Sequence, residues 1–197
     1  MLYTIENDDL KVIVSSDGAE MQSIIVKQSG REALWQANVE GYWNRHAPVL
    51  FPYCGCLPNN KFTHNGKEYT SGQHGFLRDM AFSLVSQKGD EIVLACTDNA
   101  ETLTKYPFHF YAEIKYIVVG NVLHHFVKVK NTSDEKMYFN IGYHPAFSCP
   151  FDEKHIASDY TIKFEQKETP TEFIYNPETG FNTGKMRTVF ENSDELP

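Results

Sequence analysis

Two histidines stand in segments whose neighbours suit proton transfer. His144 follows an apolar stretch in residues 140–147 (NIGYHPAF), and His74 lies in residues 72–79 (GQHGFLRD). Imidazole is the side chain whose unperturbed pKa lies nearest neutrality, so a positioned pair can exchange protons at physiological pH. Pro145 biases His144 toward an extended backbone, and the glycines on both sides of His74 leave room for a ligand to approach the main chain. We therefore predict an acid–base site on His144 and His74.

The aromatic residues beside His144 indicate what such a site would bind. Tyr143 and Phe147 can wall one side of a sugar-sized pocket. Sugars bind through apolar C–H faces against aromatic rings, together with a few directed polar groups. The local sequence leaves an alternative open, in which His144 is a core histidine bonded to a backbone carbonyl.

Two arginines are candidate substrate-binding residues. Arg78 follows His74 and can donate two hydrogen bonds to a sugar or a carboxylate. Arg45 and His46 precede an apolar run and are candidate polar contacts at a pocket rim. The alternatives are a surface ion pair between Arg78 and Asp79 and a structural role for Arg45 at an edge strand.

The remaining histidines and the cysteines indicate structural roles and no metal site. His124 and His125 are adjacent on a predicted strand, so their rings point to opposite faces and cannot hold one ion. The four cysteines are irregularly spaced, which suits reduced thiols in a cytosolic protein. Cys54 and Cys56 lack the second close pair that a zinc site needs. We expect neither a metal nor an organic cofactor.

Composition narrows the class of protein. A chain of 197 residues is long enough for one well-buried domain. The net charge of −8 disfavours nucleic acid or an anionic membrane as a partner. No apolar run approaches the ~20 residues of a membrane span, and the start does not resemble a signal peptide. We expect a cytoplasmic protein, either a monomer or a homodimer.

The elements that must position these residues are short strands with period-two alternation, closed by glycine and asparagine turns. Predicted strand pairs are 2–6 with 10–14, 19–26 with 33–36, 82–87 with 91–97, and 109–119 with 122–130. A further hairpin is predicted around Asn65 and Gly66, and one helix at 100–106. A strand at 137–141 would deliver His144, and the tail at 191–197 contains no finished element. The pattern predicts an all-β antiparallel sandwich in a single domain over residues 1–197.

Several motifs, in order along nearly the whole chain, resemble one family. They are RHAPVLFP at 45–52, NGKEY at 65–69, QHGFLRD at 73–79, KYPF at 105–108 and GYHPAF at 142–147. Together they resemble the aldose 1-epimerase (galactose mutarotase-like) family, in particular its LacX-like branch. The resemblance implies a large antiparallel β-sandwich that binds a hexose without a metal or organic cofactor.

The resemblance also implies a reaction, the interconversion of α and β anomers. A base takes the proton of the C1 hydroxyl while an acid protonates the ring oxygen; the ring opens, the C1–C2 bond rotates, and the ring closes from the other face. His144 matches the family's general acid. His74 matches the second histidine, which hydrogen-bonds the sugar and holds the opening ring.

Two departures from the family pattern bear on function. The family's catalytic glutamate and a sugar-binding aspartate belong to a C-terminal part beyond residue 197, so the chain is expected to be C-terminally incomplete; neither Glu191 nor Glu195 matches the base. Cys56 stands where the family commonly has a sugar-binding arginine, whose bidentate donation a thiol cannot replace. Two alternatives stay open: a sugar-binding module without catalysis, and a hexose-6-phosphate epimerase using Arg45, Arg78 and Lys61.

Overall fold

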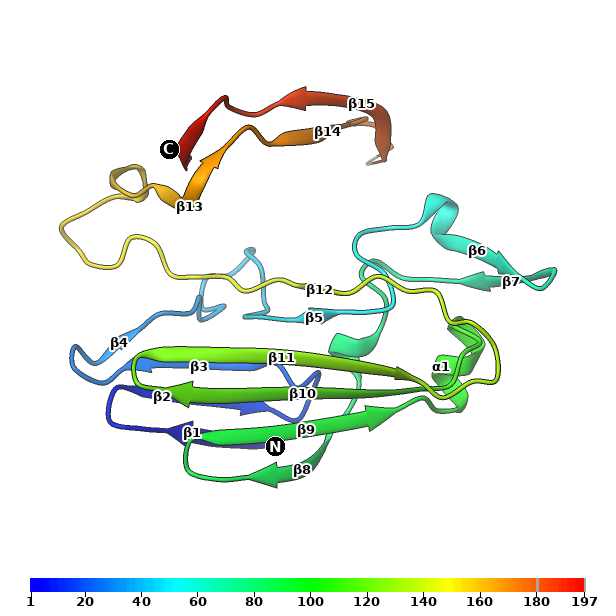
Figure 1. Cartoon of the computed structure of the whole chain (residues 1–197), viewed down its shortest axis with the longest axis horizontal. Helices are drawn as coiled ribbons and strands as arrows, with labels where there is room; N and C mark the ends of the chain where they lie inside the picture. Colours follow the sequence, from blue (N-terminus) through cyan, green and yellow to red (C-terminus); the bar gives the residue numbers. More distant parts are fainter. Residues whose placement is uncertain (180, 197) are drawn as a thin grey trace. The chain divides into compact units, whose positions relative to one another are not determined.

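The computed structural model describes residues 1–179 and 181–196, and strands dominate it (Figure 1). The chain forms two compact units, Met1–Ser148 and Cys149–Pro197, and each is described by itself. The expectation of one domain over residues 1–197 stays a prediction. Within the described residues, no helix is both long and apolar enough to cross a membrane. All four cysteines are free thiols.

The first sheet of the larger unit confirms the predicted N-terminal hairpin. Its strands run antiparallel in the order β1 (Leu2–Glu6), β2 (Leu10–Ser15), β3 (Met21–Val26) and β4 (Arg31–Glu32). The fourth strand was predicted at 33–36 and lies earlier. The Glu32 carboxylate accepts from the backbone N–H groups of Ile24 (2.8 Å) and Leu34 (2.9 Å). A side chain thus takes over donors that a longer ladder would use, and the strand ends at Glu32.

The second sheet contains the longest strands and confirms both remaining predicted pairs. It runs in the order β11 (Val122–Asn131), β10 (Phe110–Val119), β9 (Glu91–Thr97) and β8 (Ser83–Gln87). In β10 every second side chain from Phe110 to Val118 is buried. In β11 the half-buried positions include His125 and alternate with exposed ones, as a strand with one core face requires.

One hydrophobic core joins the two sheets. It combines Ile5 and Val12 of the first sheet with Ile92 and Ile114 of the second. Burial of apolar surface contributes roughly 25 cal/mol per Å2, so such a shared core is the main stabilising term of the unit. The predicted all-β antiparallel sandwich is confirmed.

Short elements complete the unit and carry the candidate site. They are β5 (Val49–Leu50), η1 (Pro58–Asn60), β6 (Lys61–His64), β7 (Lys67–Thr70), η2 (Leu77–Asp79), α1 (Ala100–Lys105) and β12 (Gly142–Tyr143). The β6–β7 hairpin and α1 confirm predictions. A capping box formed by Asn99 and Thr102 begins α1.

The predicted strand at 137–141 is wrong, and the two-residue strand β12 follows directly after it, paired with β5. Beyond Leu50, the segment that follows β5 contains Pro52, which has no backbone N–H to donate to a neighbouring strand. The carbonyl of Phe51 instead accepts from the N–H groups of Phe76 (3.0 Å) and Leu77 (3.2 Å). In the segment before β12, the Asn140 N–H donates a backbone hydrogen bond to the Pro52 carbonyl at 2.9 Å.

The described residues of the second unit form two strand pairs. They are β13 (Ile162–Glu168) with β16 (Ser193–Leu196), and β14 (Thr171–Tyr175) with β15 (Asn182–Thr188), and a short η3 (Ala157–Asp159) precedes them. The expectation that 191–197 holds no finished element is therefore wrong for 193–196, where Ile162 pairs with Leu196.

Candidate functional site

His74 is fixed by reciprocal hydrogen bonds to Gly55. Its backbone N–H donates to the Gly55 carbonyl at 2.8 Å, and the Gly55 N–H donates to Nδ1 of its ring at 2.9 Å. A backbone N–H can only donate, so Nδ1 is the acceptor and the neutral ring carries its proton on Nε2. His74 also has a φ of +65°, which is uncommon for a residue with a side chain. The surroundings therefore determine both the tautomer and the backbone conformation of His74.

The charge state of His74 is biased toward neutrality. Its pKa is lowered first by desolvation, then by the positive charges of Arg78 and His144. The effect of His144 is the smallest of the three. Because its pKa is lowered, the half-buried ring is neutral near neutral pH, and its Nε2–H can donate a hydrogen bond.

Gly75 serves the packing of the His74 loop rather than the approach of a ligand. A Cβ at Gly75 would lie 2.2 Å from the Phe51 carbonyl oxygen, and the φ is +70°. Gly72, by contrast, has open space around it and no such backbone angle. Of the two glycines that sequence reasoning assigned to ligand access, Gly75 is therefore required by a close main-chain contact.

His144 is held through its backbone and leaves its ring exposed. Its N–H donates to the Pro48 carbonyl at 3.1 Å, and the Ala146 N–H donates to the His46 carbonyl at 2.8 Å. The residue is exposed, and among the described residues no group hydrogen-bonds its ring nitrogens. The alternative of a core histidine satisfied by a carbonyl does not describe His144.

Trp43 supports the His144 ring, and sequence reasoning gave it no role. The two rings lie 4.9 Å apart between centroids, at 48°. The Trp43 carbonyl accepts from the indole N–H of Trp35 at 2.7 Å. The Trp35 backbone N–H donates to the Ala146 carbonyl at 3.0 Å, and its own carbonyl contacts Nδ1 of His46 at 2.7 Å. The adjacent aromatic residues at 42–43 were a sequence signal for a ring near the site. Which of the two rings contacts His144 depends on the contacts of Trp35, which are distant in sequence.

Tyr143 and Phe147 point in different directions. The Tyr143 ring packs on His125, with centroids 4.1 Å apart, and its hydroxyl is buried. Tyr143 therefore faces the core, as expected for the neighbour of an exposed residue on a strand. Phe147 is 59% exposed and is available to a ligand. His125 has the structural position expected of it, and burial lowers its pKa to about 4.

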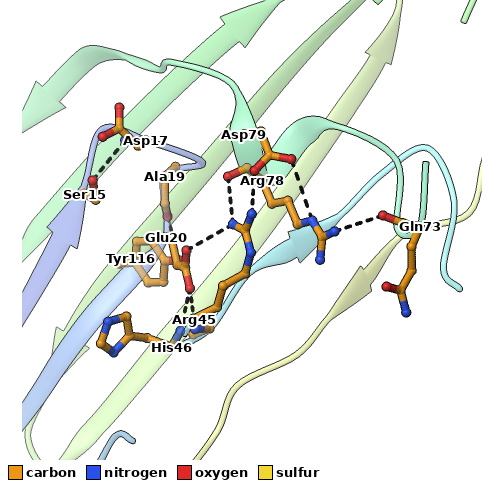
Figure 2. A network of polar contacts seen from close by, with 11 residues as sticks. Ser15, Asp17, Ala19, Glu20, Arg45, His46, Gln73, Arg78, Asp79 and Tyr116 are labelled. Atoms are coloured by element: carbon orange, nitrogen blue, oxygen red, sulfur yellow. Dashed lines mark hydrogen bonds and ion pairs between the residues drawn. The ribbon is translucent and has the colours of Figure 1, made fainter. Parts of the chain in front are cut away.

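Arg45 and Arg78 are both engaged with other groups (Figure 2). Nη2 of Arg45 lies 2.5 Å from Oδ1 of Asp79, and Nη1 lies 3.9 Å from Oε2 of Glu20. Nη2 of Arg78 donates to the Gln73 carbonyl at 3.0 Å, and its Nε lies 3.8 Å from Oδ2 of Asp79. Each arginine thus holds protein groups already. Glu20 was missed, although a carboxylate within an apolar predicted strand was a usable signal.

Two hollows in this unit are lined by neither His74 nor His144, although Gly72, Gly75 and Asp79 of the His74 loop border the first. One, of about 570 Å3, is lined by residues that include Ser71, Asn99 and Lys105. The other, of about 700 Å3, is lined by aromatic residues including Phe62, Phe108 and Tyr138. Cys56, one residue beyond Gly55, is an exposed thiol.

Comparisons with known proteins agree on one family. The sequence model of the family described as aldose 1-epimerase matches residues 1–195. The plasmid-encoded protein LacX of Lactococcus lactis subsp. lactis is 35% identical over 206 residues, which cover 100% of this chain and 67% of that protein. Its chromosomal counterpart matches to the same extent.

Solved structures are similar over the whole chain. A galactose mutarotase related enzyme from Lactobacillus acidophilus has a TM-score of 0.93 at 35% identity, covering 100% of this chain and 64% of that one. A galactose mutarotase-like protein from Lactobacillus casei has a TM-score of 0.90 at 30% identity, covering 100% and 67%. The chain thus spans about two thirds of the length of these relatives.

Proposed function

The chain belongs to the aldose 1-epimerase family, and on this premise we propose that it binds a hexose and interconverts its α and β anomers by acid–base ring opening. The proposal is supported by the different surroundings of two histidines that the family resemblance assigns to the site. His74 is held as a neutral Nε2–H donor, whereas the ring nitrogens of His144 have no hydrogen-bond partner among the described residues.

In the proposed reaction His144 protonates the ring oxygen of the sugar. An exposed ring without competing hydrogen bonds can give up a proton and take it back in the reverse step. His74 donates from Nε2 to a sugar oxygen and steadies the opening ring. The base that takes the proton of the C1 hydroxyl is assigned to no residue of this chain.

The substrate-binding residues divide by their surroundings. Phe147 offers an exposed ring for the C–H face of the sugar. Tyr143 supports the site from the core side, because its ring packs on His125. Arg45 and Arg78 shape the His74 loop through their ion pairs and backbone contacts.

The test measures anomer equilibration and sugar binding on the same protein. Freshly dissolved α-D-glucose and α-D-galactose are followed by polarimetry with and without protein, and binding is followed by ligand-observed NMR. We expect equilibration faster than the spontaneous rate in proportion to protein concentration. Neither binding nor acceleration with any hexose tested would contradict the proposal.

A sugar-binding module is the second candidate, and Cys56 is the observation that favours it. This exposed thiol follows the Gly55 that fixes His74, in a place where the resemblance expects a sugar-binding arginine. Tight binding without equilibration in the same experiment would select the module. A preference for glucose 6-phosphate over glucose would select the hexose-6-phosphate epimerase instead. The structure does not favour that outcome, because Arg45 and Arg78 already lie against the carboxylate of Asp79.

A further inference from the structure

We propose that Glu20 and Arg45 are positioning residues that tie the backbone carrying His144 to the loop carrying His74. Figure 2 shows Arg45 lying between Glu20 and Asp79, with Arg78 between Asp79 and Gln73. The catalytic consequence of this role rests on the proposed function, whereas its effect on the His74 ring does not.

Glu20 fixes the segment that precedes β5. Its side chain is almost fully buried, and Oε1 accepts from the N–H groups of His46 at 2.7 Å and Ala47 at 2.9 Å. A buried carboxylate is costly unless hydrogen-bonded or paired, and charge-assisted bonds from backbone N–H groups are strong. Glu20 therefore holds two consecutive peptide groups in place.

Those peptide groups carry the His144 segment. The His46 carbonyl accepts from the N–H of Ala146, and the Pro48 carbonyl accepts from the N–H of His144. Within residues 1–179 and 181–196, the ring of His144 forms no hydrogen bond and contacts the ring of Trp43. Its position thus follows from the backbone that Glu20 fixes.

Arg45 connects this segment to the other histidine. One end of its guanidinium lies 2.5 Å from Asp79, while Nη1 donates to the Arg78 carbonyl at 3.4 Å and lies 3.9 Å from Glu20. Its side chain is 26% exposed, so the ion pairs are partly shielded from water. A planar guanidinium can hold a carboxylate and a carbonyl at once in a fixed geometry, which an ammonium group cannot do.

The far side of the network reaches the residue next to His74. Arg78 donates to the Gln73 carbonyl, and Asp79 ends η2 close to Arg78 Nε. Residues 73–79 are thereby held at both ends. Because a misplacement of about 1 Å can cost ~10²-fold in rate, a device that fixes the separation of two proton-carrying groups matters for catalysis.

The experiment replaces Arg45 and reads the ring of His74 directly. Arg45→Met removes the guanidinium but leaves the Glu20 carboxylate buried without a cation, which can prevent folding. The double variant Arg45→Met/Glu20→Gln avoids this, because the amide oxygen still accepts from His46 and Ala47. Lys115→Met is the matched control, since it removes a 2.7 Å ion pair to Glu91 elsewhere in the unit.

Two readouts are compared on the folded proteins. Long-range 1H–15N correlation spectra report the tautomer of His74, and polarimetry reports kcat and KM. We expect the unmodified protein to show the Nε2–H tautomer, and the Arg45 variants to show a mixture with Nδ1–H. We expect kcat to fall about tenfold to hundredfold in the Arg45 variants with KM changed less than twofold, and Lys115→Met to change neither.

The outcomes separate this inference from the proposed function. An unchanged tautomer and an unchanged kcat, with lower thermal stability alone, would reduce the network to a structural role and overturn the inference. If the unmodified protein equilibrates no sugar, the proposed function fails, and the tautomer spectra still decide whether Arg45 positions His74.

Discussion

The segments that carry His74 and His144 are built in opposite ways. The His74 ring is hydrogen-bonded at Nδ1, its backbone has a positive φ, and two arginines hold the surrounding loop. The His144 ring is exposed, and its segment is held by main-chain bonds to Pro48 and His46. Similar histidine motifs thus hold one ring in a single tautomer and leave the other exposed to solvent.

Loss of the proposed general acid should have the strongest effect on rate. His144→Ala should reduce any epimerase rate by at least tenfold, since general acid catalysis contributes typically ~10²–10⁴-fold. The fold should be kept, because the ring is exposed and its backbone bonds remain. Polarimetry gives the rate and circular dichroism gives the fold. An unchanged rate would contradict the role of His144 as the acid.

The next effect tests the constrained segment. Gly75→Ala should lower the free energy of unfolding by about 3 kcal/mol, since a Cβ would meet the Phe51 carbonyl oxygen and the left-handed conformation costs ~1–2 kcal/mol by itself. Urea unfolding measures the change. Gly72→Ala is the control and should change stability by less than about 0.5 kcal/mol. Equal losses in both variants would show that the contact with Phe51 is unimportant.

A smaller effect tests the support beneath His144. Trp43→Ala should reduce the epimerase rate about two- to tenfold, because aromatic contacts are worth ~0.5–1.5 kcal/mol beyond burial. Tyr42→Ala, at the exposed neighbouring position, should change the rate less than twofold. Steady-state polarimetry compares the epimerase rates of the two variants. Equal rates would show that the contact of Trp43 with His144 does not contribute to catalysis.

The smallest effect tests whether the two rings sense each other. Both Arg78→Met and His144→Gln should raise the pKa of His74, since each removes a positive charge that lowers it, and the Arg78 change should be the larger. NMR titration of the imidazole C–H signals measures both. A His74 pKa that does not respond to His144→Gln would place the rings too far apart to share one sugar.

Short-range patterns allowed much of the fold to be predicted. Asn65 and Gly66 both have positive φ at the turn of the β6–β7 hairpin, as the Asn-Gly pair indicates. Period-two alternation located β10 and β11 to within a residue. The strand at 137–141 failed because its ladder depends on Pro52 and Phe51, which are distant in sequence.

The two histidines were predictable as candidates, whereas their supports were not. The place of Glu20 in an apolar predicted strand was a signal that it is unusual, but its partners are backbone groups more than twenty residues away and could not be read from it. The reason for Gly75 is likewise a distant carbonyl, that of Phe51. Ring chemistry can be inferred from residue type and neighbours, but tautomer and tethering depend on tertiary contacts.

His125, beneath Tyr143, has a further consequence for tolerance of acid. Its folded pKa of about 4 lies below the value of ~6.5 for an unfolded chain, so the unfolded form takes up a proton first as pH falls. The stabilisation is complete above about pH 6.5 and is lost as pH drops toward 4, by roughly 3 kcal/mol in all. Urea unfolding at several pH values should show the decline in the unmodified protein and a shallower one in His125→Phe. Acidification toward pH 4 would therefore weaken the fold beneath the candidate site, in a pH range where surface carboxylates begin to take up protons as well.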